Sequence, residues 1–403
     1  MPARRLRRSN VQIASPPAIV RHFAHTSPGL PSAVSGWWED CDILATGWIT
    51  AQQKGHKMRE VVRIVALTIP FASQLGISLA ASQSPEPETF FHSFVGLTDD
   101  QIRDIGAGKA VAKVLDTPKP DEVFVFGAVY IDSTPERYLK AASDIDALRR
   151  LPNYLELRKF SDPPQLADLA GFTLDDEDIK ELQHCKPGDC EVQLPTEAME
   201  DFQQSVNWSA PDAAAQANRL AQQMALQALL HYQQGGNTAL GTYRDKRHPA
   251  AVAETFASML QQMKAMPVYL PELEQYLLEY PKAPSGAIKS EFYWEKVNFG
   301  LKPTLRIVQA VVFHATSADK PAYAVAVKQL YASHYFETAL DLTVCVKDVN
   351  RPGFFLITVK GSQQAGLTGF KGSIVRKVAV DKTRSSLQRA LAAYKQKLEG
   401  QTN

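Results

Sequence analysis

The segment CKPGDC places two cysteines, Cys185 and Cys190, on either side of a Pro-Gly pair. Pro187 and Gly188 favour a turn, which brings the two thiols together. In an oxidising compartment such a pair forms a local disulfide. The neighbouring His184 is also a zinc-ligand residue type, but one histidine and two cysteines at a single turn leave a tetrahedral zinc ion one ligand short. We therefore expect a disulfide between Cys185 and Cys190 and no bound metal.

Aromatic residues with polar tips recur in two apolar segments, EFYWEKV and YASHYF, and in the polar segment TYRDKRHP. A few such groups among apolar neighbours fix the orientation of a small molecule in a pocket. The segment TYRDKRHP also has the charges to bind an anion or exchange protons, although solvated loops have the same composition. The alternative for each residue is an ordinary core or surface position. We expect the ligand-binding residues to be Tyr293, Trp294, Tyr331, His334, Tyr335, Tyr243 and Arg244.

The sequence contains none of the common catalytic motifs. A GxSxG nucleophile elbow, an HExxH helix, a Walker loop and a dinucleotide fingerprint are all absent. His334 is suited to act as a general base, yet no carboxylate partner can be assigned to it from sequence. We therefore assign no catalytic residue, expect no cofactor, and favour a function other than catalysis.

Residues 58–80 have the organisation of a secretory signal peptide. A short basic start is followed by an apolar run and then by small residues at Ser78 and Ala80, where cleavage is expected. We therefore expect Met58 to be the true start and the mature protein to be periplasmic or secreted. The alternative is an uncleaved signal anchor, although Pro70 interrupts a run that is barely long enough to span a bilayer.

Residues 1–57 differ from the rest of the chain. They hold a cluster of arginines and no sustained apolar period, so we interpret them as an upstream segment that is mistranslated or disordered. Residues 1–80 contain nine Lys or Arg and four Asp or Glu, against 44 and 43 in the whole chain, so the remainder has a net charge of −4. A general nucleic-acid binder needs a concentrated positive face, so we expect no nucleic-acid partner.

The mature chain begins with an N-terminal segment, residues 81–120, whose first part, residues 82–94, is polar, contains proline and is expected to be flexible. The segment DEVFVFGAVYID then predicts a strand, because valines alternate with aromatic and small residues. A helix that starts at Pro135 and a further strand, YLELRKFS, follow. Residues 167–284 are predicted to form a mostly helical insertion, with Ser209 as the cap of its longest helix.

From residue 288 onward the pattern is that of a β-sheet. Five apolar runs separated by turn residues predict five successive strands, and strands of this kind form an antiparallel meander. A long amphipathic helix, roughly residues 372–399, ends the chain. Its many lysines and arginines would suit peripheral contact with anionic lipid, or would simply form its solvent side. The predicted fold class is therefore α+β.

Two segments carry a resemblance to a known superfamily. They are VFGAVYIDSTPERYLKAASDIDALRRLP near the start of the mature chain and FFLITVKGSQQAGLTGFKGSIVRKVAVDKTRSSLQRALAAYKQKLE at its end. Their order of strand, Pro-Glu helix start, late strands and long terminal helix resembles the START-like, or SRPBCC, helix-grip fold. The resemblance implies that residues 121–403 form a curved antiparallel sheet that grips the terminal helix, interrupted by the insertion at 167–284. It also implies an apolar cavity between sheet and helix.

The function that we expect is binding or carrying a hydrophobic ligand, for which a lipid is one candidate, by an exported protein. One alternative is an enzyme, similar to the cyclases and hydrolases of related folds, that acts on a hydrophobic substrate in the same cavity. The other is a protein-interaction module whose core is filled. An open apolar pocket of several hundred cubic ångströms would favour ligand binding over the interaction module.

Overall fold

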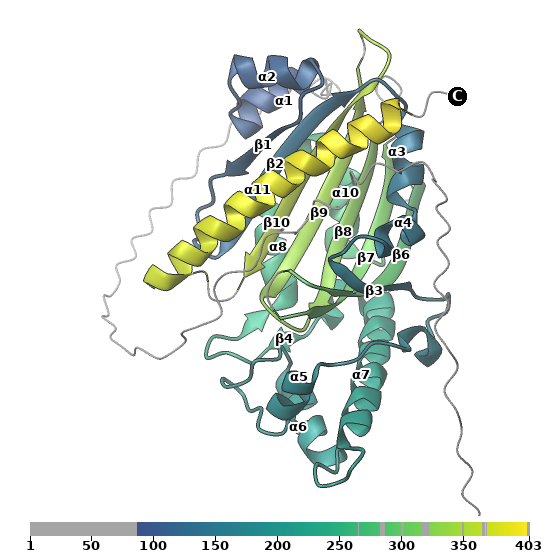
Figure 1. Ribbon diagram of the computed structural model, residues 1–403, viewed down its shortest axis with the longest axis vertical. Helices are drawn as coiled ribbons and strands as arrows, with labels where there is room; N and C mark the ends of the chain where they lie inside the picture. The colour runs from purple at the N-terminus through teal and green to yellow at the C-terminus, as the bar shows by residue number, and fades with distance from the viewer. Residues whose placement is uncertain are drawn as a thin grey trace, which may run out of the picture. The chain divides into compact units, whose positions relative to one another are not determined.

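One antiparallel sheet organises the described part of the chain (Figure 1). The computed structural model describes residues 87–264, 266–282, 287–299, 302–315, 322–348, 350–364, 367 and 369–400. The expected signal peptide and the upstream segment lie outside these residues. Of the two units into which the chain divides, all described residues belong to the second, Val34–Asn403.

The sheet has eight strands in the order β1-β2-β10-β9-β8-β7-β6-β3, and every neighbouring pair is antiparallel. The expected meander of five strands is confirmed, because β6 to β10 are neighbours in chain order. The sheet is open, with β1 and β3 at its edges. Its strands are β1 Val111–Leu115, β2 Glu122–Ile131, β3 Tyr154–Lys159, β6 Ala287–Val297, β7 Thr304–Ala315, β8 Ala322–Ala332, β9 Phe336–Lys347 and β10 Phe354–Gln364.

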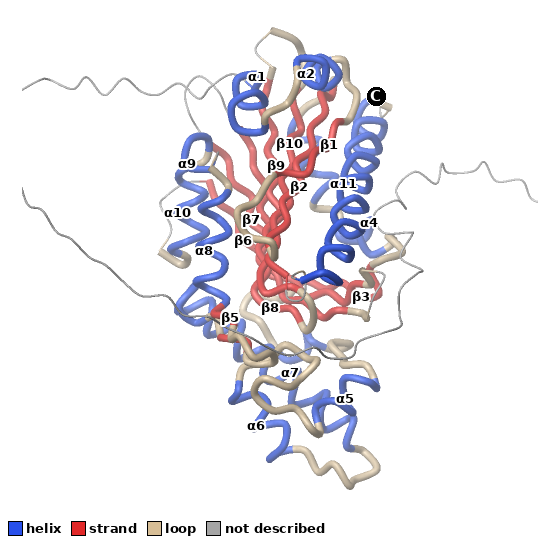
Figure 2. The backbone as a smooth tube through the Cα atoms, turned by 90° about the vertical axis from the view of Figure 1, so that its left-hand side faces the viewer, coloured by secondary structure: helices blue, strands red, loops and turns tan. Residues whose placement is uncertain are grey.

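Both faces of the sheet are covered, as the burial of β2 shows. All ten residues of this strand are buried, and their side chains alternate between the two faces. Val125 and Val129 belong to the cluster under the C-terminal helix, whereas Phe126 and Ala128 pack with the N-terminal helices. A strand with two apolar faces needs helices on both sides, and Figure 2 shows helices on each side of the sheet.

The C-terminal helix α11, Gly369–Glu399, lies across one face of the sheet (Figure 1). It buries Leu387 and Leu391 against β2. Gly127 on β2 permits this approach, because a Cβ there would lie 2.7 Å from a Leu391 methyl carbon and 2.9 Å from the Leu387 side chain. The helices α3, Pro135–Ala142, and α4, Ile145–Arg149, cover the rest of this face. An antiparallel sheet with a long C-terminal helix is compatible with a helix-grip arrangement.

The opposite face carries two groups of helices besides α7, Ala213–Gly235, which packs on Trp294 and Ile307. One group is N-terminal: α1 Pro87–Phe90, the π-helix η1 Phe91–Val95 and α2 Asp99–Gly106. The other group is α8 Val252–Gln262, α9 Met266–Tyr269 and α10 Pro271–Glu279. The expectation that residues 82–94 are flexible was wrong for the described part, because Phe90 and Phe91 are buried against the sheet. The many polar residues predicted a flexible segment, but two adjacent aromatic side chains within it supply enough apolar area to dock it on the sheet.

The predicted helical segment lies between β3 and β6, which pair directly with each other. Besides α8 to α10 it contains two 3₁₀ turns, three helices and a small β-hairpin. The longest helix is preceded by Asp212 as its N-cap residue, so the prediction of Ser209 as the cap was wrong. The 3₁₀ turns are η2 Leu166–Leu169 and η3 Gly236–Ala239. The helices are α5 Asp176–Leu182, α6 Thr196–Ser205 and α7 Ala213–Gly235, and the hairpin strands are β4 Thr242–Tyr243 and β5 Ala250–Ala251.

Among the residues that the structure describes, no helix combines the length and the apolar character that a bilayer span requires.

Candidate functional site

The two cysteines of CKPGDC form the expected disulfide. Both side chains are buried, and the turn between them is held by mutual backbone hydrogen bonds of Lys186 and Asp189. Glu181 is the third member of the one cluster in the described residues with metal-ligand spacing. Since both sulfurs are consumed in the disulfide, this cluster does not offer the thiolates that zinc binds. The third described cysteine, Cys345, is free and buried.

Two of the expected ligand-binding residues, Tyr293 and Trp294, are neighbours on β6 and therefore face opposite sides of the sheet. Tyr293 lies on the α11 side, where its hydroxyl donates a hydrogen bond to Glu291. The Trp294 indole donates a 2.7 Å bond to the Asp168 carbonyl and packs edge-on against Phe172. Both side chains are buried and satisfied by the protein, so the structure does not bring them together at one cavity.

Tyr243 and Tyr331 do meet, with ring centroids 6.2 Å apart. They line a cavity of about 460 Å³ between α6, α7 and the strands β7 and β8. Alanines such as Ala225 line it on α7, and their short side chains leave space above the sheet. The Tyr243 hydroxyl accepts a 3.1 Å bond from the Ala332 amide. Arg244 is exposed and does not line this cavity.

His334 and Tyr335 belong to a buried ionic network. The His334 ring contacts a carboxylate oxygen of Asp178 through Nε2 at 3.1 Å and the Glu191 carbonyl through Nδ1 at 3.0 Å. Lys302 lies 2.5 Å from the other Asp178 oxygen, and the Tyr335 hydroxyl accepts a bond from the Lys302 amide. Burial by itself would raise the pKa of Asp178, but the bonds from His334 and Lys302 outweigh it and lower the pKa. This network joins α5 to the β8–β9 turn.

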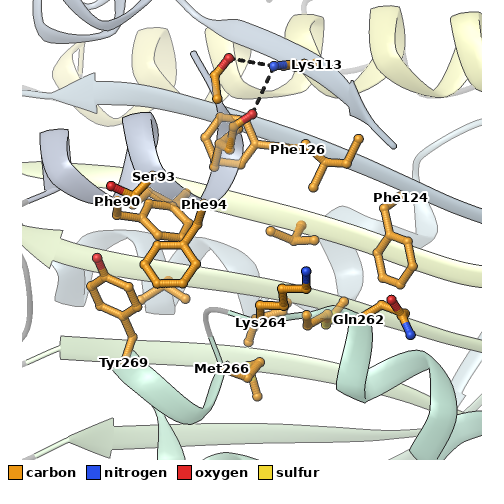
Figure 3. Close-up of a pocket in the computed structure, with 18 of the residues that line it drawn as sticks. Phe90, Ser93, Phe94, Lys113, Phe124, Phe126, Gln262, Lys264, Met266 and Tyr269 are labelled. Carbon is orange, nitrogen blue, oxygen red and sulfur yellow. Dashed lines mark hydrogen bonds between the residues drawn. The ribbon is translucent and has the colours of Figure 1, made fainter. Parts of the chain in front are cut away.

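A larger cavity, of about 590 Å³, lies where none of the expected residues is found. It opens between the two groups of helices that cover the same sheet face, with α1 and η1 on one side and α8 and α9 on the other (Figure 3). The sheet side of its lining consists of aliphatic residues of β9 and β10, such as Val344 and Ile357. Its aromatic lining residues are Phe90, Phe94, Phe124, Phe126 and Tyr269.

The N-terminal wall of this cavity is fixed by hydrogen bonds. The amine of Lys113 on β1 donates to the carbonyls of Val95 and Gly96 at 2.9 and 2.7 Å, as the dashed lines in Figure 3 show. Gly96 has a φ of 66°, a conformation that ends the π-helix and turns the chain toward α2. Thr98 then caps α2 through a capping box with Gln101. The C-terminal end of this wall is therefore tied to strand β1 of the sheet.

Few polar groups line the cavity. Asp116 and Lys264 are exposed residues of its lining, and Gln262 contributes an amide. The Tyr269 hydroxyl is buried and has no hydrogen-bond partner in the described structure. Burial raises the pKa of this phenol, so it is neutral and able to donate. A buried hydroxyl without a partner is costly to the folded state.

The chain matches no model of a known protein family and no curated protein.

The α11 face offers a much smaller cavity, of about 160 Å³. Arg306 and an ion pair between Lys360 and Asp341 contribute to its lining. The helix-grip resemblance implied the apolar cavity on this face, but two large and mainly apolar cavities lie on the opposite one. Sequence reasoning missed the cavity of about 590 Å³ because its lining comes from three distant segments. The one local signal was the group of three phenylalanines in FFHSF, residues 90–94.

Proposed function

We propose that this protein binds a hydrophobic small molecule in the cavity between η1, α9 and the sheet. The supporting observation is the cavity of about 590 Å³, which is lined mainly by aromatic and aliphatic side chains. Small-molecule sites are typically concave, mostly apolar and about 300–1,000 Å³ in volume. Protein interiors otherwise contain few voids larger than a water molecule. A cavity of this size therefore supports ligand binding over a filled interaction module.

Export and a divergent helix-grip fold are part of the same proposal. The disulfide between Cys185 and Cys190 supports an oxidising compartment, in keeping with the signal-peptide pattern at 58–80. The open antiparallel sheet under α11 supports a helix-grip domain that carries a helical insertion. In this proposal the ligand lies on the sheet face opposite α11, where the N-terminal helices and the insertion meet.

The first experiment is to express the chain from Met58 in a bacterial host and purify it under native conditions from the envelope fraction. Intact mass and mass spectrometry of a solvent extract are then measured on one sample. We expect a mature mass that starts near Ala81 and a co-purifying hydrophobic molecule. An uncleaved cytosolic protein would contradict export, and a protein with nothing bound that also takes up no hydrophobic probe would contradict ligand binding.

A pair of variants tests the position of the ligand. Val344 is half-buried on β9 and lines the cavity. Val344→Phe should fill the cavity and reduce the amount of co-purified ligand, whereas Val344→Ala should enlarge the cavity and keep the ligand. Thermal unfolding of both variants checks that they remain folded. Equal ligand content in the two folded variants would show that the ligand lies elsewhere, for example in the cavity beside Tyr243.

A further inference from the structure

We infer that the ligand is a single-chain amphiphile with an anionic head group, and that the ammonium group of Lys264 binds this head. The inference rests on the proposed function, because it assigns a ligand class to the same cavity. Three observations carry it: the position of Lys264, the different use of the other lysine in the lining, and the apolar floor of the cavity.

Lys264 lies in the short connection between α8 and α9, at the cavity lining. In the view of Figure 3, its amine projects into the space between Phe94 and Phe124. The residue is exposed, and none of the ion pairs or hydrogen bonds within the described part of the chain uses this amine. An ammonium group placed among aromatic side chains has its donors available for an incoming anion.

The second lysine of the lining, Lys113, has a structural role instead. Lys113 donates to the carbonyls of Val95 and Gly96 and so holds the N-terminal wall. Asp116 is the acidic residue of the lining, and no ion pair within the described residues joins it to Lys264. With two lysines and one aspartate, the lining has a positive charge balance. A cationic head group would be repelled by Lys264, and a neutral one would form no ion pair with it.

The remainder of the cavity suits a hydrocarbon chain. Its floor is formed by aliphatic residues of β9 and β10, namely Leu342, Val344, Val346, Ile357 and Val359. Phe90 and Tyr269 form part of the lining opposite this floor, with ring centroids 5.0 Å apart. A chain that extends from Lys264 over this floor would bury methylene groups, and each buried CH₂ strengthens binding by about fourfold. The volume suits one chain of drug-like size.

The test uses the protein produced from Met58 after removal of co-purified material. The probe is a fluorescent fatty acid, and the competitors share a sixteen-carbon chain: hexadecanoate, hexadecyl phosphate, hexadecanol and hexadecyltrimethylammonium, each below its micelle concentration. We expect both anions to displace the probe, hexadecanol to be about threefold to tenfold weaker, and the cation to be weakest. The ratio of the two anions distinguishes a carboxylate head from a phosphate head.

Lys264→Gln is the decisive variant. It should weaken both anions by about threefold to tenfold and leave hexadecanol unchanged, and added salt should weaken the anions only in the unmodified protein. Lys180→Gln, at an exposed lysine on α5, is the matched control and should change nothing. If hexadecanol binds as well as hexadecanoate, or if Lys264→Gln has no effect on the anions, this inference fails while ligand binding stands. If no competitor and no probe binds, the proposed function fails as well.

Discussion

The side-chain amine of Lys328 lies 4.2 Å from the centroid of the Phe256 ring, and both side chains are fully buried. The amine also donates to the hydroxyl of Tyr232 at 3.1 Å, to the Leu277 carbonyl at 3.2 Å and to the side chain of Asn237. All of these groups are neutral, and within the described residues no carboxylate pairs with Lys328. Burial without a counter-charge lowers the pKa of this lysine to about 7.

This lysine should make the stability of the protein depend on pH. Between pH 7 and 10.5 the unfolded chain keeps the proton that folded Lys328 has lost, so the free energy of unfolding rises with pH. The slope should approach 1.4 kcal/mol per pH unit, the value for about one proton. Denaturant unfolding at pH 7, 8 and 9 measures it, and Lys328→Met should remove this part of the slope.

Two comparisons make the result specific. The buried thiol of Cys345, whose pKa burial raises, contributes an opposite trend, but equally in both proteins. Lys180→Met, at an exposed lysine, should leave the slope unchanged. Parallel pH profiles for the unmodified protein and Lys328→Met would show that folded Lys328 stays charged.

The ionic network around Asp178 should stop stabilising the folded protein at low pH. Because the folded pKa of Asp178 is lowered, its contribution is complete above the unfolded pKa, near 3.8, and is lost as the pH falls through the folded value. Asp178→Asn should reduce the free energy of unfolding at pH 7 by about 1–3 kcal/mol and should matter less at pH 2. Asp176→Asn, at an exposed position on α5, should cost less than about 1 kcal/mol. Equal costs at pH 7 and pH 2 would contradict an ionised Asp178.

The contact between β2 and α11 can be tested by adding one methyl group. Gly127→Ala places a Cβ within 2.7 Å of Leu391, so either the helix or its side chains must move. We expect a loss of about 1–3 kcal/mol in the free energy of unfolding. Gly241→Ala is the matched control, because a Cβ at that position meets no atom within 4 Å. If both variants are equally stable, α11 does not pack as closely on β2 as described.

Counting reactive thiols by alkylation tests the disulfide. A chain that starts at Met58 contains three cysteines, so unfolding without reductant should expose one reactive thiol, Cys345, and unfolding with reductant should expose three. The double variant Cys185→Ser, Cys190→Ser should lose about 2 kcal/mol, as the closed loop is short. Three reactive thiols without reductant would rule the disulfide out.

Local patterns in the sequence were enough to predict much of the fold. The alternating runs after residue 288 predicted strands β6 to β10, and the valines of DEVFVFGAVYID predicted β2. The Cys185–Cys190 disulfide was also predictable, because both partners and the turn lie within six residues. In each case the physical cause, side-chain alternation or turn preference, acts within one short segment.

Long-range contacts were not predictable in this way. The carboxylate partner of His334 is Asp178, 156 residues earlier in the chain, and no spacing rule connects them. The proposed binding cavity is formed by side chains such as Phe90, Tyr269 and Val344, which become neighbours only when the helices dock on the sheet. Since Tyr293 and Trp294 are adjacent on one strand, the alternation of a strand separates them rather than joining them at a pocket.

The pairing of β2 with β10 determines when the proposed ligand site can form. These strands are joined in register from Glu122 with Gln363 to Ile131 with Phe354, so an early and a late segment of the chain are neighbours. During synthesis, β2 and the N-terminal wall must therefore wait for almost the whole polypeptide to emerge. If the chain is exported as proposed and crosses the membrane unfolded, it would cross empty and acquire the proposed ligand only at its destination.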